Sequence, residues 1–311
     1  MNNSNFVICN LLAGGGQAKK RWDKFLSDVG ERGIEITTKI TERHGHAIDI
    51  ANDAVKSGIR RIAVFGGDGT LNEALNGILK ANKSENRDTE LIYLGAGSSC
   101  DVEKNFPDKQ PLIDRLLSKH HYTVDVCRVE CYDFSGNKIE RYFLANSSIG
   151  VISLAVHLFN RKTPFMDFLK RVNIDLAALS QGVKALLKFD RMGCTISIDG
   201  KNLQTIPLKN LTVFKCAYFG GGMNYGIETE FDDKQFHVAL IDNVNRLTLF
   251  SMIPPLYTGT ILENKHAHHY VAKSFDIKNT GKDAYVETDG EIVGVPPCRY
   301  TILPECLKLI L

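Results

Sequence analysis

The 311-residue sequence carries almost no excess of charge, because 38 Lys and Arg stand against 36 Asp and Glu. A balance this even creates no field strong enough to indicate nucleic acid as a partner. A long apolar run is also missing, and no stretch approaches the eighteen or so residues that a membrane-spanning helix needs. The first twenty residues lack the basic, apolar and small-residue regions of a secretory signal. These absences predict a cytoplasmic protein.

The cysteines show no spacing that is typical of a metal site or a disulfide framework. There are eight of them, and the only close pair, Cys127 and Cys131, has neither a CxxC spacing nor a second pair at zinc-site distance. Most lie in apolar stretches, where Cys behaves as a small core residue, so we predict reduced thiols. His266, His268 and His269 fall on a strand-like run, a pattern more typical of an exposed strand face than of metal ligands.

Two patterns of predicted secondary structure follow one another along the chain. Over the first 125 residues, predicted strands (6–9, 34–40, 61–65 and 91–94) alternate with predicted helices (18–29, 47–57, 70–81 and 112–119). That alternation predicts a parallel sheet covered on both faces, with ligands bound at the carboxyl ends of its strands. After about residue 124, strands follow in close succession, which predicts a β-sandwich or barrel.

A predicted helix over residues 164–189 interrupts the succession of strands after residue 124. Its apolar residues recur at helical spacing, and four basic residues accompany them: Lys170, Arg171, Lys184 and Lys188. An apolar stripe with a basic edge is typical of a helix that covers a sandwich, and also of a helix that docks onto a membrane surface. Both interpretations stay open at this point, and the first is the more frequent.

The clearest chemical signal is the run 66–73, Gly-Gly-Asp-Gly-Thr-Leu-Asn-Glu, which follows an apolar strand. Its glycines let the backbone approach a polyphosphate, and the N–H groups at the start of the next helix supply donors for anions. This run resembles the nucleotide loop of the diacylglycerol kinase, sphingosine kinase and bacterial lipid kinase family. NAD kinases share the same core, so further motifs must separate the two.

Two nucleotide-side segments also resemble the lipid kinases. Residues 10–14, Asn-Leu-Leu-Ala-Gly, resemble the family's Asn-Pro-x-Ser/Ala-Gly segment, with Leu11 in place of Pro. Residues 94–101 resemble its Pro-x-Gly-Thr-x-Asn-Asp loop, with Cys100 in place of Asn. The first departure reduces rigidity, and the second brings the local geometry of the loop into question.

Two later segments complete the resemblance. Residues 219–223 and 230–234 resemble a glycine run and an acidic turn that hold a structural Mg²⁺ in some bacterial members, although Glu230 replaces a basic or neutral residue. Residues 286–291, Val-Glu-Thr-Asp-Gly-Glu, resemble the family's Val-Asp-Gly-Glu motif. A carboxylate there makes chemical sense, because a hydroxyl that attacks a γ-phosphoryl group must lose its proton.

The resemblance implies an α/β nucleotide-binding lobe of the NAD-kinase and phosphofructokinase type, with a parallel sheet, and an all-β sandwich lobe. The first lobe would comprise residues 1–125 with a returning strand at about 297–311, and the second, for the lipid substrate, residues 126–296. The implied nucleotide contacts are Asn10, Gly14, Thr41, Gly66, Gly67, Asp68, Gly69, Thr70, Glu73 and Ser98. Asp68, Asp101 and Asp125 would hold a catalytic Mg²⁺, partly through water, Asp233 a structural Mg²⁺, and Asp289 and Glu291 would be catalytic.

A lipid kinase that uses Mg²⁺ and ATP to phosphorylate diacylglycerol or a similar lipid is therefore the leading hypothesis. It would contact the membrane only peripherally, and the sequence leaves a homodimer open. An NAD-kinase-like enzyme with a small soluble substrate is the alternative, which the loop 98–101 and the placement of 289–291 argue against. A non-catalytic lipid- or nucleotide-binding regulator is the third hypothesis. The presence of the motif carboxylates argues against it: Asp68, Asp289 and Glu291.

Overall fold

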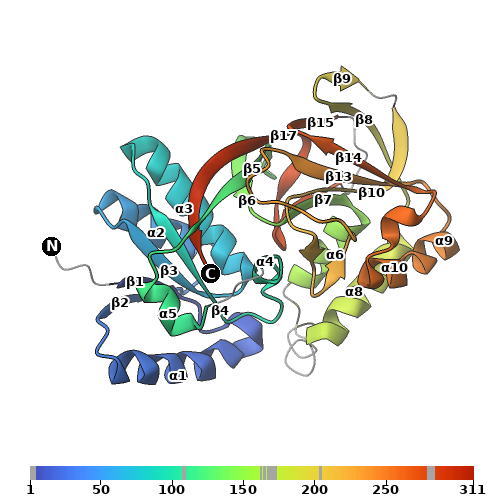
Figure 1. Cartoon of the computed structure of the whole chain (residues 1–311). Coiled ribbons are helices and arrows are strands. Elements are labelled where there is room, and N and C mark those ends of the chain that lie inside the picture. The colour runs from blue at the N-terminus through green and yellow to red at the C-terminus, as the bar shows by residue number, and fades with distance from the viewer. Residues whose placement is uncertain are drawn as a thin grey trace. The chain divides into compact units, whose positions relative to one another are not determined.

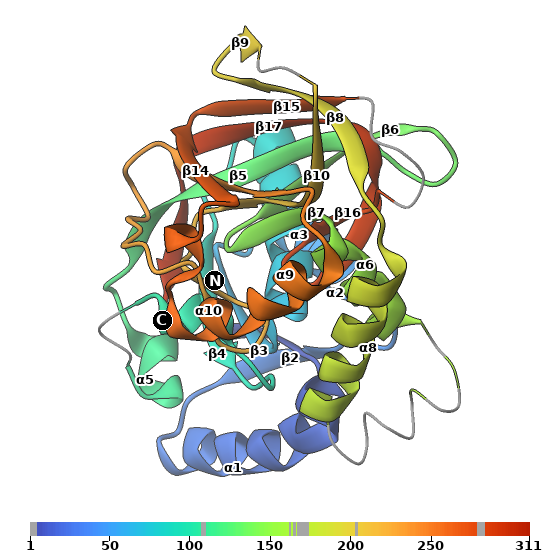
Figure 2. The ribbon, with the colours of Figure 1, turned by 90° about the vertical axis from the view of Figure 1, so that its right-hand side faces the viewer.

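The computed structural model describes residues 5–106, 110–161, 163, 166, 174–202, 205–278 and 284–311 (Figures 1 and 2). Contacts divide the chain into two compact units. Unit 1 comprises Met1–Val126 and Pro304–Leu311, and unit 2 comprises Cys127–Leu303. Two long strands, β5 (Tyr122–Tyr132) and β17 (Glu291–Ile310), begin in one unit and end in the other.

Unit 1 is built on a parallel sheet in the order β4-β3-β1-β2. Its strands are β1 (Asn5–Cys9), β2 (Ile36–Ile40), β3 (Arg61–Gly66) and β4 (Glu90–Gly95). The end of β17 pairs in parallel with β4, with Lys308 opposite Glu90. Each strand lies within two residues of its predicted position, because short apolar runs bounded by polar loops are a strong local signal.

Helices cover both faces of the unit 1 sheet (Figure 1). They are α1 (Gln17–Glu31), α2 (His46–Lys56), α3 (Asp68–Glu85), the short α4 (Asp101–Lys104) and α5 (Leu112–Leu117), with the 3-10 turn η1 (Ala13–Gly16) before α1. On one face, Trp22 and Phe25 of α1 pack on Phe65 with ring centroids 4.9 and 5.5 Å away. Burial of each such ring contributes about 1.5–3 kcal/mol and fixes α1 against the sheet.

Unit 2 is dominated by antiparallel strands. They are β6 (Lys138–Phe143), β7 (Asn146–Gly150), β8 (Met192–Ile198), β9 (Lys201–Asn202), β10 (Ile206–Phe214), β11 (Tyr218–Phe219), β12 (Met223–Asn224), β13 (Phe236–Asp242), β14 (Ala267–Ala272), β15 (Ser274–Lys278) and β16 (Val286–Thr288). One run of neighbours is β14-β13-β10-β7-β16-β17, and β15 pairs with both β17 and β8. Their inward-facing apolar side chains form one continuous core. The predicted fold class, a parallel α/β part and a β-sandwich part, is confirmed.

The helices of unit 2 within the described residues are α6 (Val151–Asn160), α8 (Ile174–Lys188), α9 (Arg246–Ser251) and α10 (Ile253–Thr258), with the 3-10 turn η2 (Ile261–Glu263). The sequence predicted only α8 among them, as part of a longer helix over 164–189. Lys170 and Arg171 of that prediction lie outside the described residues. Within the part of the chain that the structure describes, no helix is both long and apolar enough to cross a bilayer.

Candidate functional site

The loops that follow β1, β3 and β4 pack on one another through glycine backbone. A Cβ built on Gly97 would lie 2.6 Å from the Cα of Gly67, which is closer than any real contact. A Cβ on Gly14, whose φ is +59°, would lie 3.3 Å from the carbonyl oxygen of Ala96. Side chains are therefore excluded where these loops meet, and the carboxyl edge of the sheet presents bare backbone to a ligand.

A hydrogen bond between Asn10 and Thr70 connects the loop after β1 to α3. The Asn10 Nδ2 donates to Thr70 Oγ1 at 2.9 Å, and the Asn10 backbone N–H donates to the carbonyl of Phe65 at 2.9 Å. Thr41, after β2, donates its N–H to the Cys9 carbonyl at 2.9 Å. The structure thus brings Asn10, Gly14, Gly67 and Thr70 to one edge of the sheet, although their sequence positions span 60 residues.

The start of α3 offers backbone donors. Its N-cap is Gly67, with extended backbone (φ −93°, ψ −178°), and no side chain caps the first turn. The N–H of Leu71 donates to the Gly67 carbonyl at 3.0 Å. Because the first N–H groups of a helix lack partners within it, Asp68, Gly69 and Thr70 present a positive end to an anion. Gly66 lies just before, and a Cβ there would meet the Thr70 side chain at 2.8 Å.

Asp68 and Asp101 lie side by side at this edge. Asp68 Oδ2 accepts the Asp101 N–H at 2.9 Å, and its Oδ1 accepts the Tyr93 hydroxyl at 3.1 Å. Burial, together with the Asp68 charge, raises the pKa of Tyr93, so the phenol stays protonated as a donor. Cys100, where the family has Asn, adopts a left-handed conformation (φ 47°, ψ 50°), one that Asn adopts more readily.

Asp125, the third carboxylate of the predicted Mg²⁺ site, makes a hydrogen bond to β17, and its part in a metal site stays a prediction. Its side chain is fully buried, and its Oδ1 accepts the backbone N–H of Glu305 at 2.9 Å. Glu305 has a positive φ of 49°, so Asp125 satisfies a donor at an irregular point of β17. Among the described residues, no three His, Cys, Asp or Glu side chains are arranged to hold a metal ion. Asp68 and Asp101 supply carboxylate oxygens of the kind that Mg²⁺ prefers, and the Asp101 carboxylate also accepts from the Lys104 ammonium group at 2.7 Å.

Two other predicted nucleotide contacts occupy different environments. Ser98 is exposed at the tip of the loop after β4. Glu73 instead holds the start of α2, where its carboxylate accepts the Gly45 N–H at 2.7 Å and the Ala47 N–H at 3.1 Å. Burial opposes ionisation of Glu73, but its hydrogen bonds, first that to His44, leave its pKa below the usual range. The carboxylate thus supports the fold, and any role in nucleotide binding stays a prediction.

In unit 2, Asp289 occupies a tight turn between β16 and β17. Both of its oxygens accept backbone N–H groups at 3.0 Å: Oδ2 from Leu144, and Oδ1 from Ala145 and Asn146. Asp289 and Gly290 both have positive φ, 45° and 89°, as a type I′ turn requires. The turn is thereby fixed to the start of β7.

Two residues flank this turn. Glu291 begins β17 directly after it and is partly buried. Asn160, at the end of α6, donates from Nδ2 to the Gly290 carbonyl at 3.0 Å. The two predicted catalytic carboxylates therefore differ in setting, since Asp289 is clamped by the backbone and Glu291 lies at the accessible end of a strand.

Glu287 is a residue of this region that the sequence interpretation missed. It is 2% exposed, and its carboxylate accepts the N–H of Gly290 at 2.6 Å and of Ser148 at 3.0 Å. Burial, opposed in part by the Gly290 bond and reinforced by Asp289, raises the pKa of Glu287 to about 8. Its position could have revealed it. Glu287 lies two residues before Asp289, and alternate residues of a strand share one face.

Replacing Glu287 with Gln should change how stability depends on pH. The folded-state pKa of Glu287, about 8, lies above its ordinary value of 4.5. The raised pKa therefore adds to the free energy of unfolding. This added stability is fully present below pH 4.5 and is lost as the pH rises through about 8. Gln does not titrate, so Tm of the variant minus Tm of the wild type should increase by several degrees from pH 5 to pH 8.5. Parallel Tm curves would contradict this assignment.

Asp233, the predicted ligand of a structural Mg²⁺, forms an ion pair with a buried lysine. The ammonium group of Lys215, 1% exposed, is hydrogen-bonded to Asp233 Oδ1 and, at 2.8 Å, to the carbonyl of Gln235. A carboxylate and a carbonyl are the donors that a hard cation would use, and here a lysine already supplies the charge. A structural Mg²⁺ at Asp233 stays a prediction, and the motif did not reveal that Lys215, directly after β10, reaches the acidic turn.

Comparison with known proteins agrees with this architecture. Residues 4–129 match the diacylglycerol kinase catalytic domain, and residues 161–311 match the YegS C-terminal NAD kinase beta sandwich-like domain. The chain is similar to a Bacillus subtilis protein named "Putative lipid kinase YtlR", 24% identical over 98% of both chains. It is also similar to a diacylglycerol kinase of Staphylococcus saprophyticus, 23% identical over 97% of this chain and 93% of that one. A "putative diacylglycerol kinase" from Bacillus anthracis, of known crystal structure, superposes with a TM-score of 0.74 over 99% of this chain and 95% of its own at 21% identity.

The fold and the backbone-lined edge define a protein with a kinase-type nucleotide domain and a β-sandwich-like domain. More narrowly, the two matched domains account for most of the chain, and it belongs to the diacylglycerol kinase-like lipid kinase family. The predicted family resemblance is thus confirmed.

Proposed function

We propose that this protein is an ATP- and Mg²⁺-dependent lipid kinase that transfers the γ-phosphoryl group to the hydroxyl of diacylglycerol or a similar lipid. The observation that carries the proposal is the glycine edge of unit 1, where Gly14, Gly67 and Gly97 exclude side chains beside the uncapped start of α3. Such an edge suits a polyphosphate, because backbone N–H groups and the helix dipole stabilise its charge. Family membership and the relatives named diacylglycerol kinase support the same class of reaction.

Asp68 and Asp101 are the residues that would hold Mg²⁺ with the nucleotide. A magnesium ion in a kinase is usually held by one or two carboxylates together with substrate phosphates, which matches this pair. When bound, the ion neutralises charge on the phosphoryl oxygens. The chain's own part is to fix the pair: Tyr93 and the Asp101 N–H orient Asp68.

Asp289 and Glu291 are the candidates for acceptance of the lipid hydroxyl proton. Asp289 is fixed by three backbone N–H groups, so its carboxylate cannot rotate away. Glu291, at the partly exposed start of β17, would support it, or the two roles are exchanged. Under this proposal unit 1 binds nucleotide, and unit 2 binds lipid at the surface of a cytoplasmic membrane.

The test is a phosphorylation assay with labelled ATP and a panel of acceptors presented in detergent micelles. Diacylglycerol, monoacylglycerol, a sphingoid base, phosphatidylglycerol and a polyprenol form the lipid arm, and NAD forms the soluble arm; GTP in place of ATP reads out donor preference. Labelled lipid that disappears in the Asp68→Asn variant would support the proposal. Labelled NADP with no labelled lipid would favour the NAD-kinase-like alternative, and no label in any acceptor would favour a non-catalytic regulator.

A further inference from the structure

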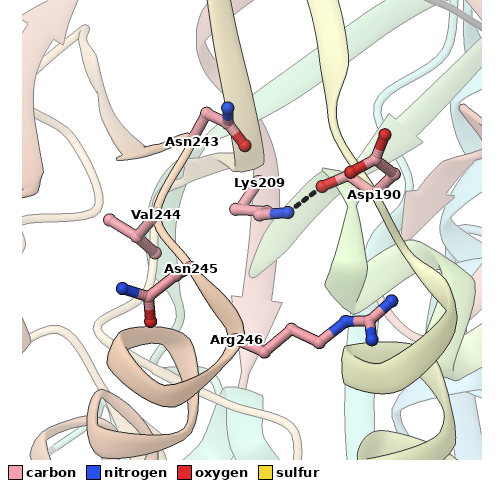
Figure 3. A pocket seen from close by; sticks show the side chains of 6 residues that line it. All are labelled: Asp190, Lys209, Asn243, Val244, Asn245 and Arg246. Carbon is pink, nitrogen blue, oxygen red and sulfur yellow. Dashed lines mark hydrogen bonds between the residues drawn. The ribbon is translucent and has the colours of Figure 1, made fainter.

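Unit 2 contains a cationic pocket that none of the residues assigned above explains. It has a volume of about 400 Å³ and lies between the segment after α8 and the segment between β13 and α9 (Figure 3). Its lining is almost entirely polar: Asp190, Lys209, Asn243, Val244, Asn245 and Arg246. Two of these side chains, Lys209 and Arg246, are basic, and Asp190 is acidic.

Lys209 is the unusual member of this lining. It is 4% exposed, and its Nζ donates to the backbone carbonyl of Asp190, as the dashed line in Figure 3 marks. Burial lowers the pKa of Lys209; the Asp190 charge opposes this shift, and Arg246 and Arg191 add to it. Asp190 offsets the burial of this ammonium group only in part, so a further anion would stabilise it together with the nearby guanidinium groups. The pocket therefore has the chemistry of a binding site for a phosphate group.

A second pocket adjoins the first and shares Asp190 with it. Its volume is about 290 Å³. The buried side chains Leu154, Leu158 and Phe189 give it an apolar part, and the exposed side chains Arg161, Lys188 and Arg191 give it a basic part. A phosphate site beside a pocket that has both an apolar and a basic part matches an amphiphile with an anionic headgroup better than it matches a free anion.

Two exposed leucines are adjacent in sequence to basic residues that line the two pockets. Leu247, which follows Arg246 on α9, is 84% exposed, and Leu187, which precedes Lys188 on α8, is 50% exposed. Helices α8 and α9 contact each other, and Figure 2 shows them side by side. Large apolar side chains that water surrounds, next to basic ones, are typical of surfaces that enter the interface of a bilayer.

We propose that this surface of unit 2 docks onto an anionic bilayer, with a phospholipid phosphate in the Lys209–Arg246 pocket and Leu187 and Leu247 in the apolar region beside it. An anionic bilayer complements the basic side chains and also accommodates the exposed leucines. A soluble phosphate would leave the leucines without a role. The inference does not depend on the proposed kinase activity, because it concerns binding alone.

The surface is connected to the Asp289 turn through α6. Leu154 and Leu158 of α6 line the second pocket, and Asn160 at its end holds the Gly290 carbonyl. His157 of the same helix stacks on Tyr285, with ring centroids 4.2 Å apart, just before β16. A lipid bound in this region would thus contact the helix that supports the turn.

Vesicle flotation of the full-length protein tests the proposal. The vesicles are phosphatidylcholine alone or phosphatidylcholine mixed with phosphatidylglycerol, at low and at physiological salt. The wild type should float only with the mixed vesicles, and less at higher salt. The double variant Arg191→Gln/Arg246→Gln should bind about 25-fold more weakly, since each basic residue near an anionic surface is worth about fivefold. Leu247→Ser should also weaken binding.

The control is Lys273→Gln/Lys278→Gln, the same loss of charge at exposed positions of unit 2 around β15. Equal weakening in the control, or flotation of the wild type with phosphatidylcholine alone, would overturn the proposal. Because Lys209 is buried and its variants risk misfolding, the exposed arginines carry the test. A second arm measures Tm with inorganic phosphate: stabilisation that the arginine variant loses, with vesicle binding unchanged, would assign the pocket to a soluble anion.

Discussion

Replacing Asp289 with Asn should lower kcat for lipid phosphorylation by on the order of 10²–10⁴, with ATP affinity close to that of the wild type. Asn keeps the shape of the side chain but cannot accept the proton of the lipid hydroxyl. The measurement compares lipid phosphorylation and ATP binding for Asp289→Asn and Asp68→Asn side by side. Asp68→Asn should instead weaken the use of Mg·ATP, because Asp68 lies beside Asp101 at the nucleotide edge.

The structure changes one expectation about this variant. From the sequence, Asp289→Asn is expected to leave stability almost unchanged. Both oxygens of Asp289 accept backbone N–H groups, so an amide NH₂ would face at least one donor, such as the N–H of Leu144. An unsatisfied buried donor costs about 1–3 kcal/mol, so Tm of the variant should fall as well.

A matched control separates catalysis from stability. Asp133 also lies in a turn of unit 2 and accepts the N–H groups of Ser135 at 2.9 Å and Asn137 at 2.8 Å, but it is only partly buried. Asp133→Asn makes the same chemical change away from the proposed site and should keep full activity. Wild-type turnover in Asp289→Asn would end the catalytic assignment and leave Asp289 as a structural clamp, with Glu291→Gln as the next variant to assay.

Replacing Gly97 with Ala should reduce phosphoryl transfer by at least 10²-fold and weaken ATP binding. The new Cβ would be built 2.6 Å from the Cα of Gly67, so the loops after β3 and β4 must separate. Backbone cannot yield as a flexible side chain can, and the phosphate donors at the start of α3 would move with Gly67. Gly69→Ala should have the same effect on transfer, because it adds a side chain within that first turn.

Gly30→Ala is the control for both glycine variants. Gly30 lies in α1 of the same unit, and a Cβ there meets nothing within 4 Å. Ala in a helix is favoured over Gly by about 0.5–1 kcal/mol, so this variant should be at least as stable as the wild type and fully active. Variants at Gly97 and Gly69 that fold normally and retain wild-type ATP affinity would show that the edge does not bind phosphate.

The sequence by itself determined the strands and helices of unit 1 and their order. Short apolar runs and helical repeats predicted the four parallel strands and their helices to within a few residues, and the glycine-rich run after β3 marked the proposed nucleotide edge. The family resemblance followed from the same short segments. These features are local, since a strand or a glycine turn is encoded within about ten residues.

Only the tertiary structure decided which side chains meet. Asn146 donates to Asp289 from 143 positions away, and Asp125 caps Glu305 from 180 positions away. Lys215, directly after β10, pairs with Asp233, which lies just before the neighbouring strand β13. A side chain's role depends on the donors and charges that surround it after the strands have paired, and strand pairing joins segments whose separation in sequence leaves no trace in either one.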